Sequence, residues 1–364
     1  MDKKVSINLL LFKPEFYLKP CLESVLAQSF QDFELLVIDN DSQDGTARKA
    51  KEILESQNDL TDWRVVENKE NLGFAAGHNR GIEMAKGEIV ILLNQDIILD
   101  RDYIKNTVEV FRGDEKIGSV QGKLLRLRVD GEKLQKTEFI DNVGLIILKN
   151  RRIIAAGQGQ KDGGQFEKRE EIFGVDGAVP VFRKSALEDI KLPVRIRSQK
   201  ASAGVQNYGQ IKDLDNSGEY FDEDFFMYKE DVDLAWRMRL AGWKSFYEPK
   251  AVAWHARTAG DSAAVNYFAI IRERLKINKF GKYHAFKNQR LMQIKNEQFW
   301  PLLKHLLFFL PKEIGAWAYV LVFERFTWKA IKELFQLAPR AWEKRKIIMA
   351  KKRISAKEIE RWFA

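Results

Sequence analysis

The first hundred residues alternate short apolar runs with stretches of helical periodicity. The runs VSINLLLF (5–12), FELLVIDN (33–40), WRVVEN (63–68) and EIVILLNQD (88–96) are bounded by turn residues and are typical of buried strands. Between them, FYLKPCLESVLAQS (16–29) and GTARKAKEILES (45–56) have the spacing of amphipathic helices. Strands that alternate with helices predict a mostly parallel sheet with right-handed crossovers, and therefore an α/β fold.

Beyond this region the pattern changes twice. Residues 113–217 are rich in glycine and charge, and we expect GQGQKDGGQF (157–166) and RSQKASAGVQNYGQIKDLDNSG (197–218) to be surface loops, the second a flap. Between these two loops, FGVDGAVPVFRKSAL (173–187) predicts a strand that leads into a helix. From Tyr267 onward the pattern predicts helices with many basic and aromatic residues.

The run PLLKHLLFFLPKEIGAWAYVLVFERF (301–326) is the most apolar part of these helices. Lys304, His305 and residues 311–313 interrupt it, so neither half reaches the roughly 20 apolar residues needed to cross a bilayer. Interfacial binding is the favoured interpretation, and the alternative is a helical hairpin packed on the domain with a solvated basic tail. In the interfacial arrangement the aromatic residues lie at headgroup depth and the basic ones face anionic lipid: Trp317, Tyr319, Phe323, Phe326 and Trp328, with Lys329, Lys332 and EKRKIIMAKKR (343–353).

Composition narrows the class of protein. A hydrophobic fraction of 45% in 364 residues predicts a substantial core rather than disorder. The single cysteine, Cys21, cannot form an internal disulfide, and together with the lack of a visible signal peptide it favours a cytoplasmic location. The net charge of +9 suits nucleic acid, anionic lipid or a phosphate-bearing substrate. Because the basic residues concentrate in the tail and no zinc spacing or RNA-binding signature is present, no nucleic-acid partner is expected.

Polar residues follow two of the predicted strands directly. Asp39, Asn40 and Asp41 end the second strand, and Asn94 and Asp96 end the fourth. Ligands of open α/β sheets collect at the carboxyl ends of the strands, so these side chains are placed where a nucleotide can lie. Asp and Asn before SQDGT also make ordinary turns and helix caps, and this alternative stays open.

A second acidic group, Glu230, Asp231 and Asp233, stands directly behind an aromatic run in FFMYKEDVDLAWRMRLAGW (225–243). Acids in the first turn complement the helix dipole, and Asp233 is spaced i,i+4 from Arg237 for pairing on one face. That structural explanation leaves Glu230 and Asp231 available for chemistry from the same helix end.

Three distant segments together carry a resemblance to a known family. VIDNDSQDGT (37–46), NLGFAAGHNRGI (71–82) and FDEDFFMYKEDVDLAWRMRLAGW (221–243) resemble, in order and spacing, the family 2 glycosyltransferases with the GT-A fold. GQGQKDGGQF, FGVDGAVPVFRKSAL and WHARTAG (254–260) make the bacterial rhamnosyltransferase-type branch the most similar. The resemblance covers about residues 4–280. It implies a GT-A catalytic domain over 1–265 and a helical extension over 266–364.

The resemblance also implies an activity. It is the inverting transfer of a sugar, with rhamnose the expected one, from a dTDP- or UDP-linked donor to a glycan or polyprenyl-diphosphate-linked acceptor in cell-surface polysaccharide synthesis. The tail's expected affinity for an anionic membrane surface then places the protein on the inner face of the cell membrane. Alternatives are an inactive sugar-binding or scaffold protein, a nucleotidyltransferase, which would not explain residues 225–238, and a dolichyl-phosphate-type synthase, which lacks GQGQKDGGQF.

Residue roles carry over onto the matching positions. Asp231 corresponds to the base that takes the acceptor proton, with Glu230 beside it, and Asp96 and His255 correspond to the ligands of Mg²⁺ or Mn²⁺. The usual Asp-X-Asp metal signature is NQD here, with Asn94 in its first position. Asp39 is expected to contact the imide of uracil or thymine, and the remaining nucleotide-binding candidates are Asn40, Asp41, Asn71, Gly73, Asn79, Arg80 and Asn94.

Two of these assignments have ordinary structural alternatives, and one position departs from the family. His255 is otherwise a packed histidine between its neighbours, and Arg80 is otherwise a surface arginine of the following helix. Phe12 and Lys13 replace the Tyr-Asn that usually follows the first strand, so the nucleotide contact from that strand is not carried over.

Overall fold

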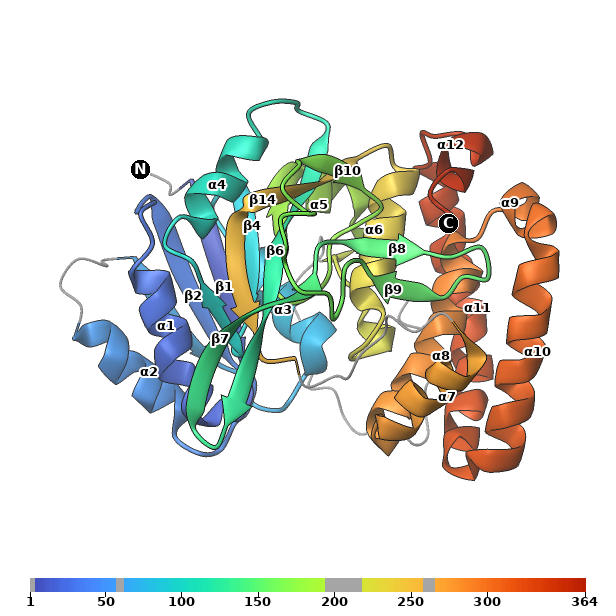
Figure 1. The fold of residues 1–364 in the computed structure, drawn as a ribbon, viewed down its shortest axis with the longest axis horizontal. Coiled ribbons are helices and arrows are strands. Elements are labelled where there is room, and N and C mark those ends of the chain that lie inside the picture. The colour runs from blue at the N-terminus through green and yellow to red at the C-terminus, as the bar shows by residue number, and fades with distance from the viewer. Residues whose placement is uncertain (1–3, 57–61, 194–217, 258–265) are drawn as a thin grey trace.

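A computed structural model of the protein describes residues 4–56, 62–193, 218–257 and 266–364 (Figure 1). The expected flap at 197–218 lies outside the described residues except for Gly218, as do residues 258–260 of the WHARTAG motif.

The N-terminal part is the parallel sheet that the sequence predicts. The strands β1 (Val5–Leu11), β2 (Phe33–Asp39), β3 (Trp63–Glu67) and β4 (Ile89–Asn94) lie side by side in the order β4-β1-β2-β3, all parallel. The helices α1 (Leu18–Leu26), α2 (Thr46–Glu55) and α3 (Gly73–Met84) connect them. The register sets Leu11 beside Asp39 and Asp39 beside Glu67, so the carboxyl ends of these strands form one edge.

Beyond β4 the sheet becomes mixed. It continues through β11 (Val181–Arg183), β6 (Ile117–Asp130) and β14 (Lys244–His255) to β10 (Glu170–Ile172), with only β6 and β14 parallel. Two further strands pair at its side, β5 (Ile97–Leu99) with β14 and β7 (Lys133–Asn142) with β6. The sequence interpretation named no strand at β6 and β7, although the apolar residues of β6 fill the core despite its charges. The strand and helix predicted within 173–187 are β11 and α5 (Lys184–Ile190).

The helix predicted behind the aromatic run is α6 (Glu230–Leu240), which lies in the interior. Asp233 and Arg237 are both fully buried, and their predicted ion pair is present at 2.9 Å. Trp236 faces a core cluster shared with the C-terminal helices, to which Leu291, Leu334 and Ile348 also contribute. The predicted helix start therefore has a structural role as well as any chemical one.

Four short strands complete the part of the chain before residue 266: β8 (Leu145–Ile147), β9 (Ile153–Ala155), β12 (Leu192–Pro193) and β13 (Gly218–Glu219).

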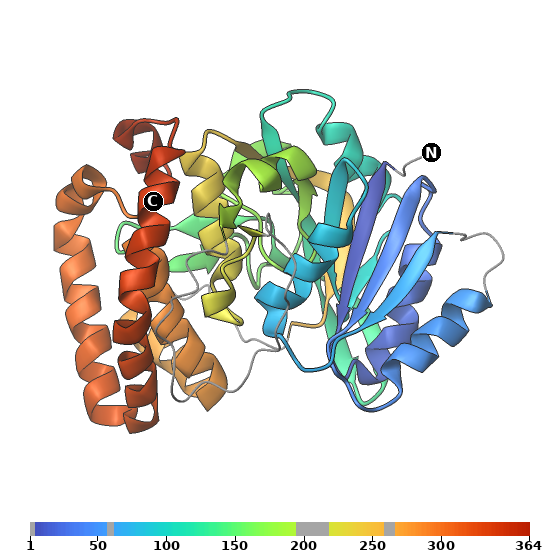
Figure 2. The same ribbon diagram turned by 180° about the vertical axis from the view of Figure 1, so that it is seen from behind.

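Six helices follow residue 266: α7 (Tyr267–Lys276), α8 (Lys279–Asn296), α9 (Phe299–Lys304), α10 (Leu306–Phe323), α11 (Trp328–Ala350) and α12 (Ala356–Glu360). Seen from both sides, α11 lies between α6 and the outermost helix, α10 (Figures 1 and 2). The division at residue 265 stays a prediction. Since α6, α8 and α11 share one apolar cluster, the helices and the sheet domain are packed together rather than loosely linked.

Two expectations for the tail are wrong. The apolar run is not interrupted at Pro311, because α10 is continuous across it, and by length and composition alone this helix could cross a membrane. The basic tail is not solvated throughout, since Lys344 is buried against acids and Lys351 donates to the carbonyls of Asp189 and Lys191, whereas Lys346 and Arg353 are exposed. Trp317 is turned inward as well, with its ring 5.1 Å from that of Phe286.

Candidate functional site

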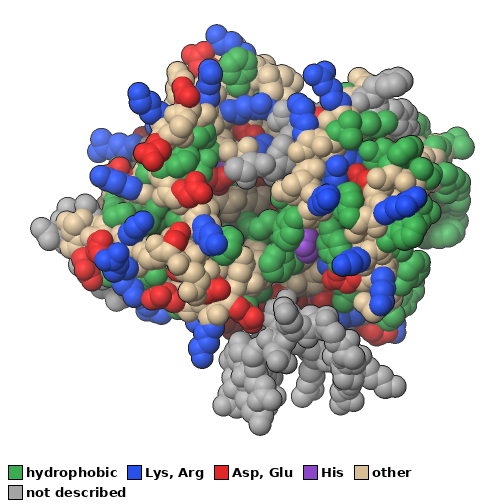
Figure 3. All heavy atoms as spheres, turned by 90° about the horizontal axis from the view of Figure 1, so that it is seen from below, with side chains coloured by type: hydrophobic (Ala, Val, Ile, Leu, Met, Phe, Trp, Pro, Cys, Tyr) green, Lys and Arg blue, Asp and Glu red, His purple; other side chains and the backbone are tan. Residues whose placement is uncertain are grey.

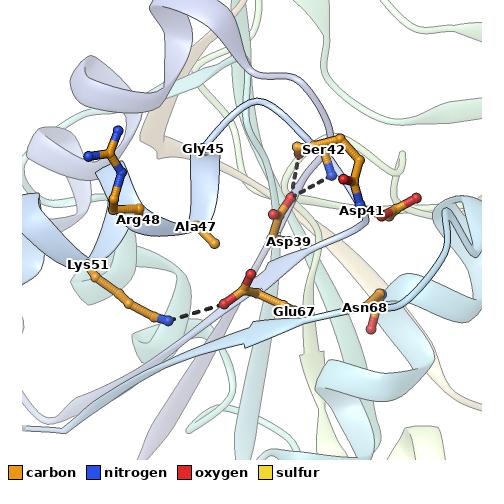
Figure 4. Close-up of a pocket in the computed structure, with 10 residues that line it drawn as sticks. Asp39, Asp41, Ser42, Gly45, Ala47, Arg48, Lys51, Glu67 and Asn68 are labelled. Carbon is orange, nitrogen blue, oxygen red and sulfur yellow. Dashed lines mark hydrogen bonds and ion pairs between the residues drawn. The ribbon is translucent and has the colours of Figure 1, made fainter.

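A pocket of about 280 Å³ opens beside the carboxyl end of β2. Figure 4 shows Asp39 and Glu67 pointing into the same space, with Lys51 reaching Glu67 at 3.2 Å. The backbone N–H and hydroxyl of Ser42 both donate to Oδ1 of Asp39, which leaves Oδ2 as an acceptor for an N–H group of a ligand. Burial raises the pKa of Asp39. The pocket is thus suited to the imide of a pyrimidine base, and that contact stays a prediction.

Asn40 holds the neighbouring loop rather than lining the pocket. Its amide donates to Oδ1 of Asn71 at 2.9 Å and to the carbonyl of Gly73 at 3.1 Å, and its Oδ1 accepts from Asn68 and from the backbone of Leu72. Oδ1 of Asn71 also accepts from the N–H of Gly73. These amides are therefore used within the protein, and their direct contact with a nucleotide is not favoured by this geometry.

Gly73 is required by a close approach of two chain segments. Its φ is +75°, and a Cβ there would lie 2.6 Å from the carbonyl oxygen of Phe226. That oxygen accepts hydrogen bonds from the N–H groups of Phe74 and Ala75, at 2.8 and 3.2 Å. The first turn of α3 thus binds the chain just before α6, and the glycine is explained without a nucleotide.

The remaining nucleotide-binding candidates lie at the same side but differ in availability. Asn79 is buried and bonded to the backbone N–H and carbonyl of Phe221. Arg80 is exposed and donates to Asn68 at the pocket edge, so it is the better placed of the two for a phosphate. Asp41 lines the pocket, and Asn94 ends β4.

Asp96 and His255 are brought together by strand pairing. His255 pairs with Ile97 across β14 and β5, and the N–H of Ala256 donates to the carbonyl of Asp96. The two side chains then face each other, with Oδ2 of Asp96 3.5 Å from Nε2 of His255. On the other side of the ring, Nδ1 lies 2.8 Å from Oδ2 of Asp141 at the end of β7. His255 is therefore not simply a packed histidine between its sequence neighbours.

The charges around His255 explain its ionisation. Burial lowers the pKa of the imidazole, but Asp96 and Asp141 outweigh that effect and raise it to about 10. For Asp141 the two effects have the opposite signs. Burial raises the pKa of this carboxyl, but the cationic His255 and Arg257 outweigh burial and lower the pKa to about 2. Without a metal the protonated ring thus pairs with Asp96 on one side and shares Asp141 with Arg257 on the other.

The pair fits a divalent cation held by few protein ligands. The described residues contain no group of three or more His, Cys, Asp or Glu side chains placed to hold a metal. Two ligands suffice where phosphate oxygens and water complete the shell. The contact of Nδ1 with Asp141 leaves Nε2 directed at Asp96, which is the outer-shell arrangement usual for metal-binding histidines.

A series of charged side chains, completed by the backbone N–H of Gly177, leads from this pair to α6. Arg257 donates to Asp141 at 2.6 Å and to Asp176 at 3.2 Å, and the N–H of Gly177 donates to Oδ2 of Asp231 at 3.2 Å. The sequence interpretation missed Asp141, Asp176 and Arg257. Two of them stand inside motifs already singled out, FGVDG and WHARTAG, but only the fold shows that they connect the sites.

The two acids that begin α6 differ in their surroundings. Oδ1 of Asp231 accepts from the N–H of Val232 at 2.8 Å, and burial followed by the like charge of Asp176 raises the pKa of Asp231. Burial, and next the charge of Asp231, raise the pKa of Glu230 well above its usual range. Oε2 of Glu230 is buried with no hydrogen-bond partner in the described part of the chain. Glu230 therefore holds its proton more tightly, and Asp231 is the acid that ionises first.

Comparison with known proteins now gives the family. The family model described as glycosyl transferase family 2 matches residues 12–191, which include the pocket, the Asp96 loop and Asp176. Residues 12–191 belong to glycosyl transferase family 2. The fold and the order of its motifs agree with that assignment, whereas the narrower rhamnosyltransferase branch stays a prediction.

A relative and two solved structures are similar over larger parts of the chain. The poly-beta-1,6-N-acetyl-D-glucosamine synthase of Staphylococcus aureus is 28% identical over 233 residues, which are 64% of this chain and 45% of that protein. The chain thus spans about half the length of this relative. TarS 1–349 of S. aureus in complex with UDP-GlcNAc has a TM-score of 0.52 at 15% identity, covering 95% of this chain and 90% of the other.

The second structure, GalNAc-T7 with UDP, GalNAc and Mn²⁺, has a TM-score of 0.54 at 12% identity. It covers 80% of this chain and 48% of the other. At these identities the structural matches establish the GT-A fold alone, and the family rests on the matched sequence.

Proposed function

We propose that this protein transfers a sugar, with inversion, from a nucleoside diphosphate donor to a glycan acceptor in cell-surface polysaccharide synthesis. The family 2 domain supports glycosyl transfer in general. The observation that carries the proposal is that Asp231, the candidate base, and Asp96 with His255, the candidate metal ligands, are connected by hydrogen bonds and ion pairs through Asp141, Arg257 and the Asp176–Gly177 peptide.

The mechanism assigns each acid a separate task. Asp231, held by the N–H groups of Gly177 and Val232, takes the proton of the acceptor hydroxyl as that oxygen attacks the sugar. Its raised pKa brings the carboxylate closer to the basicity that the step needs. Asp96 and His255 would hold Mg²⁺ or Mn²⁺, which when bound supplies positive charge against the departing diphosphate. Asp39 would fix the base at the far end of the donor.

We propose the donor sugar from the names of the similar proteins. The S. aureus synthase and the TarS complex both concern N-acetylglucosamine, which supports UDP-GlcNAc as the first donor to examine. Rhamnose on dTDP, expected from the sequence motifs, is the second. A scaffold protein of the same fold is the alternative if neither nucleotide binds.

Donor binding should depend on the metal. In calorimetric titrations of UDP with Mn²⁺, we expect binding that chelator abolishes, and Asp96→Ala should weaken it at least about tenfold because the removed carboxylate is one of only two protein ligands. Asp130→Ala, at the exposed tip of the β6–β7 hairpin, is the control and should bind as wild type. Equal binding by Asp96→Ala and wild type would remove Asp96 from the metal site.

We further propose that the protein is peripheral on the inner face of the cell membrane, with a lipid-linked acceptor. The support is an apolar surface at the C-terminal end, where Figure 3 shows hydrophobic side chains gathered at the right with Lys and Arg beside them. Leu307 is 85% exposed, and α10 carries most of this surface. Its exposed members are Phe299, Trp300, Leu303, Leu306, Leu307, Phe308, Leu310, Ile314, Leu321, Val322, Phe323, Trp328, Phe335 and Trp342.

The exposed lysines around this apolar surface favour lipid, rather than a second protein, as its binding partner. Lys304, Lys329, Lys332 and Lys346 are exposed between these apolar residues, on the same helices. Lysine is depleted at the centre of protein interfaces but is suited to anionic headgroups, with apolar and Trp side chains entering the boundary below them.

A single charge in the apolar surface should weaken membrane binding. We expect Phe308→Glu to lose most of its binding to vesicles of equal phosphatidylcholine and phosphatidylglycerol, since a buried aromatic ring contributes about 1.5–3 kcal/mol. Phe139→Glu is the control, because Phe139 on β7 is 47% exposed against 56% for Phe308, and this variant should bind normally. Co-sedimentation measures both, and equal binding by the two variants would argue against this surface. Deleting the tail is not a clean test, because Lys344 belongs to the buried charge cluster.

A further inference from the structure

Residues 225–229, which contain the aromatic run and lead into α6, have an unusual backbone. Phe226, Tyr228 and Lys229 have φ values of 62°, 71° and 74°, in the left-handed region that side chains with a Cβ seldom adopt. Such a conformation persists only where surrounding groups hold it. Because Lys229 directly precedes Glu230 and Asp231, this segment sets the position of both acids.

Four consecutive carbonyls of the segment are bound from two sides. The side-chain NH2 group of Asn288 on α8 lies 2.9, 2.9 and 2.8 Å from those of Phe225, Met227 and Tyr228, so its two hydrogens are shared among three acceptors. The carbonyl between them, that of Phe226, accepts from the first turn of α3. No peptide unit from 225 to 228 is therefore left to rotate freely.

Asn288 is placed for this task by the C-terminal extension. It is fully buried, and the neighbouring Lys287 donates to the carbonyl of Asp224 at 3.0 Å. The opposite support, the first turn of α3, follows the loop that Asn40 ties to the end of β2. The segment before α6 is thus held between the nucleotide-binding edge of the sheet and a helix beyond residue 266.

We propose that Asn288 is a positioning residue that holds Asp231 in place through the backbone of residues 225–228. The C-terminal extension then forms part of the catalytic architecture in addition to any membrane role. The proposal rests on the proposed function only in taking Asp231 as the base, because the backbone restraint is measurable by itself.

Gln289 provides a matched control on the same helix. Its side-chain amide is also buried and donates to a backbone carbonyl, that of Arg151 at 2.9 Å, away from the segment before α6. Asn288→Ala and Gln289→Ala each remove a buried amide, but only the first releases residues 225–228. Asn288→Leu keeps the side-chain volume and removes the donors, so it separates hydrogen bonding from packing.

Hydrogen exchange and kinetics of these variants test the proposal in the full chain. In both Asn288 variants we expect exchange of a peptide covering 225–232 to accelerate at least tenfold over Gln289→Ala, and kcat to fall about 100-fold with KM for the donor changed little. Unaltered exchange in Asn288→Leu and Asn288→Ala, relative to Gln289→Ala, would overturn the proposal. If the wild type transfers no sugar, the proposed function fails, while the exchange result still decides the positioning role.

Discussion

Asp231→Asn is expected to lower sugar transfer by about 10²–10⁴-fold while leaving UDP binding intact. The amide has nearly the shape of the carboxylate, and its oxygen can still accept from Gly177 or Val232, but it cannot take a proton from the acceptor. Nucleoside diphosphate release under saturating donor and acceptor measures the loss, and calorimetry with UDP and Mn²⁺ verifies that the donor site is unchanged.

The neighbouring acid gives the internal control. Because burial raises the pKa of Glu230 well above its usual range, Glu230 gives up its proton less readily than Asp231, and Glu230→Gln should lower turnover by no more than about tenfold. Near-normal turnover in Asp231→Asn, with normal folding, would show that Asp231 is not the base. A larger loss in Glu230→Gln than in Asp231→Asn would move the assignment to Glu230.

Lys344→Met is expected to lower the free energy of unfolding by about 3–5 kcal/mol. The ammonium group is 1% exposed and contacts carboxylates of Glu219, Asp222 and Asp224, so its loss leaves buried negative charge with too little compensation. Lys295 pairs with Asp222 and Asp233 but cannot reach all four acids. Methionine fills most of the space, so the effect reports the charge rather than a cavity.

A second lysine on the same helix makes the comparison direct. Lys346 is 61% exposed and, among the residues that the structure describes, forms an ion pair with Glu343 alone, so Lys346→Met should change the unfolding free energy by less than about 0.5 kcal/mol. Urea denaturation followed by tryptophan fluorescence measures both variants. Equal midpoints would mean that the charged cluster contributes nothing to the packing of α11 on residues 219–224.

The parallel half of the fold could be predicted because its signals are local. Apolar runs of five to seven residues form β1–β4, and their spacing by helices fixes the parallel order. The start of α6 was equally readable from Glu230, Asp231 and Asp233. In contrast, β6 carries charged residues along a mostly buried strand. Its pattern of apolar and polar residues therefore does not distinguish it from a loop.

The connections within the site depend on pairings between distant residues. Asp141 meets His255 only because β7, β6 and β14 pair in register, across 114 positions of sequence. Asn40 and Gly73 were expected at a nucleotide, yet one ties a loop and the other permits the approach of Phe226. Their residue types suit both roles, and only the three-dimensional neighbours distinguish them.

The partners of the charged residues in the tail could not be predicted from the sequence either. Its lysines and arginines predict a solvated or lipid-facing surface, but Lys344, Lys351 and Arg353 bind groups of the sheet domain and the segment before α6. Burial of a lysine requires paired carboxylates, and those of FDED (221–224) lie more than a hundred residues earlier. The periodicity of residues within one helix does not predict such a distant partner.

Sugar transfer itself is the most direct test of the account. Purified protein with Mn²⁺ and a polyprenyl-diphosphate-linked glycan should release nucleoside diphosphate from one donor among UDP-GlcNAc, other UDP-sugars and dTDP-rhamnose, and chelator should stop the release. Product analysis by NMR should then show an inverted anomeric configuration. No release from any donor, by folded protein that also fails to bind UDP and dTDP, would contradict the enzyme assignment and favour a scaffold role.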